Sequence, residues 1–133
     1  MDMELPVVVG LHVCERVVRD PATRNFSIIQ RKSIFRAKEF PTTFSFSVFA
    51  IFVDGFGMKA VRVEIEHLAN GLVVHEFPAI VNFPDRLREV TFGLELSEIE
   101  FWHPGEYDVS LTIDGEPMTK CKIHLLETGT EKS

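Results

Sequence analysis

The side chains of this 133-residue chain best suited to metal binding or nucleophilic chemistry are two cysteines and five histidines: Cys14, Cys121, His12, His67, His75, His103 and His124. None stands in an H-x-H, H-E-x-x-H or C-x-x-C arrangement. His67 and His75 flank one predicted hairpin, where a three-residue loop would place His67 opposite Val73. A metal there would need a third ligand, and half-exposed strand histidines explain the same pattern. We therefore expect no metal site and no cofactor.

Catalytic groups are equally hard to assemble from the sequence. Cys121 lies between Lys120 and Lys122, which would lower its pKa if it were exposed, but its predicted register turns it inward. Carboxylates two residues apart, such as Glu64 and Glu66, share a strand face, yet a solvated strand face has the same pattern. No G-x-S-x-G motif or phosphate-cradling glycine loop is present. We expect no catalytic residues and no enzyme.

The feature most indicative of function is a two-faced strand predicted over Thr43–Val53. In its second half Phe49, Ile51 and Val53 make the outward face apolar, whereas an outer sheet face is normally polar. Either the chain's own segments cover this patch or another subunit does, and exposed apolar patches commonly mark interfaces. Our hypothesis is a homodimer, or a contact with another protein, built on these three residues or on a neighbouring strand edge.

Two turn regions offer an alternative. Trp102 and His103 precede Pro104-Gly105 at a predicted corner, where the indole could either bind a partner or cap the core. Together with the loop at 54–57, this corner could serve a small-molecule or carbohydrate binder. An outer sheet face could do the same.

The charge of the chain limits the classes of partner that it can bind, and its N-terminal sequence bears on where in the cell it is found. The net charge of −6 argues against a nucleic-acid partner. Residues 15–39 nevertheless hold seven basic and three acidic side chains, a local charge of +4. These side chains either lie on solvated strand faces and loops or form a basic edge that meets an acidic partner or the protein's own acidic surface in a dimer. No apolar run of membrane-spanning length occurs, and the acidic start Met1–Glu4 does not fit a secretory signal. We expect a cytoplasmic protein with no membrane partner.

Turn residues recur every 8–14 positions and separate alternating apolar and polar runs, which predicts an all-β fold. We expect a two-layer antiparallel β-sandwich of seven to nine strands. A single domain would span residues 1–127, followed by a disordered tail at 128–133. The early strands are predicted at 7–18, 25–32 and 43–53, and the later ones at 59–68, 72–77, 88–97 and in a final hairpin. The segment 77–83 is expected to be an edge or an irregular crossing because Pro78 and Pro84 limit the ladder, and 36–40 is expected to form at most one helical turn.

The final hairpin allows its register to be predicted. Only a three-residue loop, Asp114-Gly115-Glu116, places Tyr107 opposite Ile123 and Val109 opposite Cys121, so that both apolar sets face inward.

Turns and core positions also carry a family resemblance. Asn25-Phe26-Ser27-Ile28-Ile29, Phe40-Pro41 before a Phe-rich strand, Asn70-Gly71, Pro104-Gly105-Glu106-Tyr107 and Asp114-Gly115 are the matching segments. From about Leu11 to Leu126 the chain resembles a family of small, uncharacterised bacterial proteins, a domain-of-unknown-function group with an immunoglobulin-like sandwich. The family supplies no catalytic residue or ligand to transfer. We expect a non-catalytic interaction or assembly module, with a small-molecule or carbohydrate binder as the alternative and an enzyme third.

Overall fold

The computed structural model describes residues 5–23 and 26–129, and within them every regular element is a β-strand. The predicted all-β class and its seven to nine strands are confirmed. The nine strands are β1 (Val7–Arg19), β2 (Phe26–Arg31), β3 (Ile34–Ala37), β4 (Thr42–Val53), β5 (Gly57–His67), β6 (Leu72–Phe83), β7 (Val90–Phe101), β8 (Gly105–Ile113) and β9 (Glu116–Glu127). The described chain contains no helix long and apolar enough to cross a membrane.

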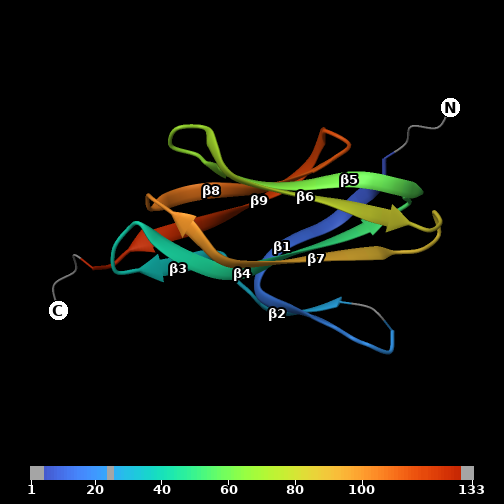
Figure 1. Ribbon diagram of the computed structural model, residues 1–133, viewed down its shortest axis with the longest axis horizontal. Coiled ribbons are helices and arrows are strands. Elements are labelled where there is room, and N and C mark those ends of the chain that lie inside the picture. The colour runs from blue at the N-terminus through green and yellow to red at the C-terminus, as the bar shows by residue number, and fades with distance from the viewer. Residues whose placement is uncertain (1–4, 24–25, 130–133) are drawn as a thin grey trace.

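The strands form two layers, with order β2-β1-β4-β7 in one sheet and β3-β9-β8-β5-β6 in the other (Figure 1). Sequence alternation explains which face each strand buries. In β5, Val61, Val63 and Ile65 are buried, and Arg62 and Glu64 between them point outward. Side chains two residues apart share a face, so this pattern turns the apolar set toward the opposite sheet.

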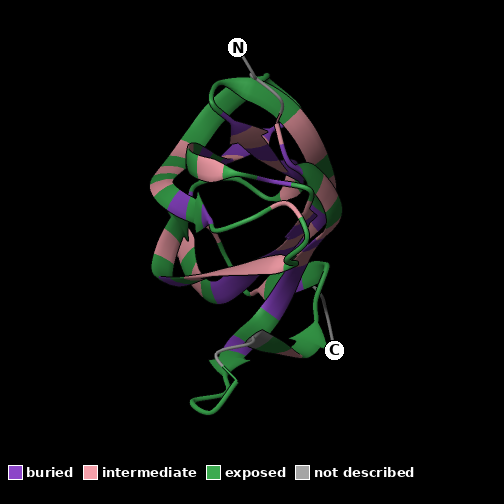
Figure 2. Ribbon diagram, turned by 90° about the vertical axis from the view of Figure 1, so that its right-hand side faces the viewer, coloured by how far each residue is buried: buried purple, intermediate pink, exposed green. Residues whose placement is uncertain are grey.

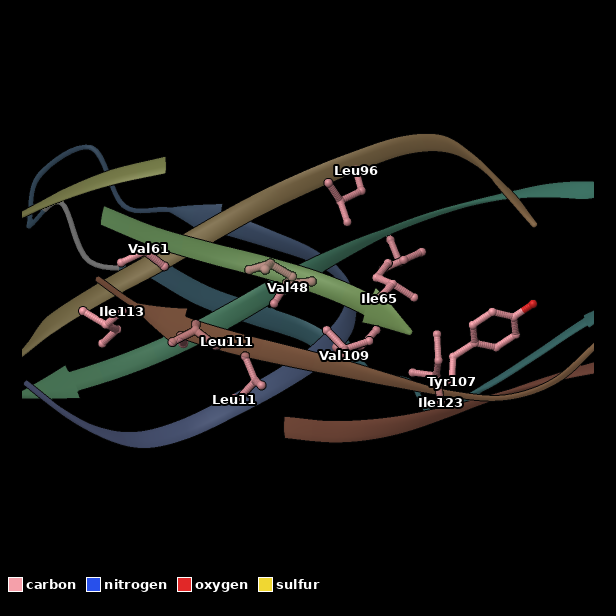
Figure 3. Close-up of a cluster of buried hydrophobic side chains, with 14 of the residues drawn as sticks. Leu11, Val48, Val61, Ile65, Leu96, Tyr107, Val109, Leu111, Ile113 and Ile123 are labelled. Carbon is pink, nitrogen blue, oxygen red and sulfur yellow. The ribbon is translucent and has the colours of Figure 1, made fainter. Parts of the chain in front are cut away.

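The core lies between the two sheets. Val48 and Leu96 from one sheet lie among Ile65, Val109 and Leu111 from the other in a cluster of buried side chains (Figure 3). Burial is concentrated on the strand faces that look into the sandwich, and most turn residues are exposed (Figure 2). Each fully buried aliphatic side chain contributes about 1.5–3 kcal/mol, so this interior is the main source of stability.

The strand order is that of an immunoglobulin-like sandwich. The β4–β7 pair takes the place of strands B and E, and β9, β8, β5 and β6 follow the order G, F, C, C′. The chain reaches this arrangement by crossing between sheets at Lys32-Ser33, after which β3 pairs with β9. That pair is parallel, an exception to the predicted antiparallel sandwich. The strand β3 itself was not predicted, because 36–40 was expected to form at most one helical turn.

The final hairpin has the predicted register but a different loop. Tyr107 pairs with Ile123 and Val109 with Cys121, as expected. The prediction of a three-residue loop was wrong, because Ile113 pairs with Glu116 across the two residues Asp114 and Gly115. Both turn residues have positive φ, at 50° and 84°. A β-bulge between the Leu111 and Thr112 pairs shifts the pairing by one residue and returns the apolar sets to the interior.

The C-terminal segment joins β3. The amide and hydroxyl of Thr128 both donate to the carbonyl oxygen of Ala37, at 2.9 and 3.3 Å. Residues 130–133 of the predicted disordered tail lie outside the described residues.

Candidate functional site

A cavity of about 410 Å³ opens where the β5–β6 turn meets the end of β7 and the β7–β8 turn. Three histidines line it together with larger aromatic rings, and we call it the histidine–aromatic cavity. Asn70, Leu72, Val74 and Glu100 complete the wall. The ring-bearing residues are His67, His75, Phe101, Trp102, His103 and Tyr107.

Tyr107 forms the inner wall of this cavity. It is the third residue of β8 and is only 1% exposed. It lies at one end of the core cluster, with its hydroxyl pointing away from the cluster (Figure 3). That hydroxyl donates to the carbonyl oxygen of His103 at 2.6 Å. The arrangement is a tyrosine corner, the tie found at the E–F turn of immunoglobulin-like sandwiches. Burial raises the pKa of the Tyr107 phenol, so it stays protonated.

His67 is the middle ring of a stack. Its imidazole lies 4.5 Å from the Tyr107 ring and 5.9 Å from the His103 ring, with interplanar angles of 15° and 11°. Gly105 makes room for it: a Cβ there would lie 3.1 Å from His67 Nε2, and the glycine φ is +130°. The stack therefore depends on a residue without a side chain at the start of β8.

His75 forms another part of the wall. Its Nε2 lies 2.6 Å from the carbonyl oxygen of Glu100. A carbonyl can only accept, so Nε2 donates and, in the neutral ring, Nδ1 is left as an acceptor. The His75 ring also meets the Phe101 ring edge-to-face at 5.4 Å and 75°. Trp102, 62% exposed, stands at the cavity mouth.

The structure rearranges the histidine pair that the sequence singled out. His75 lies opposite Ile65 as expected, but a bulge between Ile65 and Glu66 places His67 opposite Leu72. The prediction of Val73 opposite His67 was therefore wrong, because the loop contains four residues. Both histidines do line the same cavity. Among the described residues, no three metal-ligating side chains converge on one point.

The two thiols are free and have raised pKa values. Cys14 is fully buried, and burial alone raises its pKa. Burial and the carboxylate of Asp108 raise the pKa of Cys121 to about 11, against a smaller opposing effect of the Val13 backbone. Since the thiolate is the reactive form, neither cysteine is an activated nucleophile.

Phe49, the first of the predicted interface residues, is covered by the chain itself. It is 6% exposed and packs in a small cluster with Cys14 and Val17. The β1–β2 hairpin projects from its layer (Figure 1), and Val17 lines a shallow cavity with Gly93 of β7. The hairpin therefore folds across the outer face of β4. Of the two alternatives, cover by the chain's own segments and cover by another subunit, the first applies to Phe49.

The other two predicted interface residues are only half-buried. Ile51 and Val53 lie near the start of β1, where Val7 pairs with Val53. Val7 is 48% exposed and Val9, at a bulge, 56%. Ile51 also packs against the cluster that contains Phe49. We call Val7, Val9 and Val53 the valine patch; a subunit contact there stays a prediction.

The sequence identified part of the cavity but not its assembly. Trp102 and His103 were singled out as a corner, and His67 and His75 as a pair. Leu72 and Val74 carried no signal, because β6 and β7 belong to different sheets and only the sandwich brings their edges together.

Several solved structures resemble this chain. The alkylpurine DNA glycosylase AlkC of Pseudomonas fluorescens, bound to DNA containing an abasic site analogue, matches with TM-score 0.51 and 10% identity. The match covers 93% of this chain but only 31% of AlkC, and it shows the fold alone. An immunoglobulin-like protein of Pseudomonas aeruginosa matches with TM-score 0.44 and 12% identity, over 94% of this chain and 99% of that one.

A third similar structure is the CARDB domain of a Pyrococcus furiosus protein in complex with di-metal ions, at TM-score 0.44 and 14% identity. The match covers 96% of this chain and 99% of the CARDB domain chain. No curated protein matches this sequence. The model of a family of unknown function, DUF6941, matches residues 10–126. The chain therefore belongs to the DUF6941 family, as the resemblance in its turns and core positions predicted.

Proposed function

We propose that this protein is a non-catalytic binding domain that holds a small organic ligand, of the carbohydrate class, in the histidine–aromatic cavity. The observation that carries the proposal is the cavity itself. Its volume of about 410 Å³ falls in the range of about 300–1,000 Å³ usual for small-molecule sites. Its wall combines ring faces with polar groups, the combination by which such sites bind and orient a ligand.

The polar groups suit a hydroxyl-rich ligand. Asn70 Oδ1 already accepts the amide of Leu72 at 3.0 Å, which leaves the Asn70 amide nitrogen as a donor. In the neutral ring, His75 Nδ1 supplies an acceptor, because Nε2 is engaged by the carbonyl of Glu100. A sugar hydroxyl can both donate and accept, and the apolar face of a sugar ring can cover the exposed indole of Trp102.

The phenol of Tyr107 is a structural group of the wall and is not placed to act as an acid or base. Burial raises the pKa of Tyr107, which keeps the phenol protonated. Its hydroxyl also donates to the His103 carbonyl, so it is already engaged.

The test is titration with a panel of neutral mono- and disaccharides, followed by calorimetry. The variant is Trp102→Ala, and the matched control is Phe56→Ala, an exposed aromatic in the 54–57 loop. We expect saturable binding of at least one sugar, weakened at least about tenfold by Trp102→Ala and unchanged by Phe56→Ala. Absence of saturation for every sugar at millimolar concentration, or equal losses in both variants, contradicts the proposal.

A second function, homodimerisation, is favoured by the valine patch. Val7, Val9 and Val53 form an apolar area on the outer face of one sheet. Such a patch can be buried by the same patch of a second copy about a two-fold axis. Light scattering after size exclusion would then give the dimer mass, and Val53→Lys would give the monomer. Val18→Lys on the hairpin is the control; a monomeric wild type at high micromolar concentration rules the dimer out.

A further inference from the structure

A second cavity lies on the side of the sandwich where the first half of β1 approaches β9. Its volume is about 270 Å³, and Lys32-Ser33, which connects β2 to β3, forms part of the wall. Four basic side chains line it together with the Cys121 thiol, and we call it the basic cleft: His12, Arg31, Lys32 and Lys122. None of the described residues that line it is acidic.

Arg31 is held in place by His12. Its Nη1 lies 3.4 Å from His12 Nδ1, and because a guanidinium can only donate, the imidazole nitrogen accepts. Burial and the charge of Arg31 lower the pKa of His12, so the ring remains a neutral acceptor at neutral pH. Among the described residues Arg31 has no carboxylate partner, and its charge is therefore not neutralised within that part of the chain.

The other two cations are also available. Lys32 Nζ lies 4.8 Å from the centroid of the buried Phe35 ring, a cation–π contact that fixes the ammonium without neutralising it. Lys122 Nζ lies 3.4 Å from Glu106, but both side chains are about half-exposed, and such ion pairs are weak. An anion in the cleft can compete with that single carboxylate.

The wall that presents these groups is fixed to both sheets. The amide of Lys32 donates to the carbonyl of Val13 in β1 at 2.9 Å. The amide of His124 in β9 donates to the carbonyl of Ser33 at 2.8 Å. The backbone that carries Lys32 and Ser33 is therefore held at a fixed position between β1 and β9.

We propose that the basic cleft binds a small, multiply charged oxyanion, such as a phosphate ester or a dicarboxylate. The planar fork of Arg31 suits two oxygens at once, and the Lys32 and Lys122 ammonium groups add point charges. Ser33 adds a hydroxyl to the wall. The cleft concentrates positive charge on a protein of net charge −6, so an anion is attracted here against the overall field.

The test is calorimetric titration with inorganic phosphate, pyrophosphate and succinate at constant ionic strength. Arg31→Gln removes the central cation, and Arg16→Gln, an exposed arginine of β1 outside the cleft, is the matched control. We expect saturable binding by the wild type, weakened at least about tenfold by Arg31→Gln and less than about twofold by Arg16→Gln. Lys122→Gln provides a second variant should Arg31→Gln fail to fold.

The relative affinities for pyrophosphate and succinate distinguish a phosphate ester from a dicarboxylate as the ligand. Pyrophosphate binding more tightly than succinate assigns a phosphate-bearing ligand, and the reverse order assigns a dicarboxylate; either supports the site. Equal losses in Arg31→Gln and Arg16→Gln overturn the proposal, because the binding is then a general effect of net charge. A wild type that shows no saturable binding of any of the three anions overturns it as well.

Discussion

The Tyr107 hydroxyl donates a 2.6 Å hydrogen bond to the carbonyl oxygen of His103, four residues earlier in the chain. The same phenol ring stacks on His67 and meets Phe101 edge-to-face at 5.2 Å. One side chain thus fixes the turn between the two sheets, closes one end of the core and forms the inner wall of the histidine–aromatic cavity. Stability and the shape of the candidate site are coupled through this residue.

Tyr107→Phe should destabilise the fold while leaving the ring stack in place. The substitution removes only the hydroxyl, so the His103 carbonyl loses its partner beside a buried ring. Because this hydrogen bond is only part-buried and His103 is an exposed turn residue, its loss should cost about 0.5–1.5 kcal/mol. Urea denaturation gives the free energy of unfolding, and an unchanged value would show that water replaces the hydroxyl at no cost.

Gly105→Ala should be more destabilising than Gly115→Ala. Both glycines have positive φ, which strains any residue with a Cβ by about 1–3 kcal/mol. Only at Gly105 would the new methyl also press on a neighbour, His67 Nε2 at 3.1 Å, whereas nothing lies within 4 Å at Gly115. The difference between the two unfolding free energies measures how tightly the His67 stack is packed, and equal losses would mean that His67 moves aside freely.

Cys121 should react slowly with thiol reagents in the folded protein. Its pKa of about 11 lies about two units above that of an unperturbed thiol, so the thiolate fraction at pH 8 falls about a hundredfold. We expect the rate of modification by a disulfide reagent in Cys14→Ser to rise at least by that factor on unfolding in urea. Comparable rates before and after unfolding would place the Cys121 sulfur in water.

His12 should make the fold less stable as the pH falls. Its pKa is lower in the folded protein than its ordinary value of 6.5, so the unfolded chain binds more protons in that range. The stability linked to a neutral His12 is present above pH 6.5 and is lost as the pH falls through the folded pKa. Between about pH 7.5 and pH 5, His12→Gln should therefore show a shallower fall in unfolding free energy than the wild type. Parallel curves would assign the pH dependence to other groups.

Alternation along single strands predicted much of this fold because each strand buries one face. The register of the last hairpin followed from the apolar sets that include Val109 and Cys121, even though the loop was misassigned. A bulge adds one residue to a strand just as a longer turn does, and the alternation of Tyr107 to Ile113 cannot tell the two apart. The same ambiguity misplaced His67 opposite Val73.

The remaining features depend on contacts between distant segments. The short strand Ile34–Ala37 has little alternation of its own and is set by its parallel partner, β9. Cover of Phe49 depends on how the hairpin that carries Val17 folds, which no local pattern encodes. Trp102 was recognisable as an unusual surface aromatic, but the cavity beside it exists only because β6 and β7 end up on the same side of the sandwich.

The parallel pairing of β3 with β9 also determines how the molecule should respond to tension. If the chain is pulled from Ser33 and Thr128, these two strands are drawn lengthwise past each other, and their interstrand bonds must break together rather than one at a time. The hairpin formed by β1 and β2, pulled at its open end, should instead unzip at low load. Optical-tweezer extension with handles at Ser33 and Thr128 should therefore give a high rupture force, whereas handles across the hairpin should give a low one.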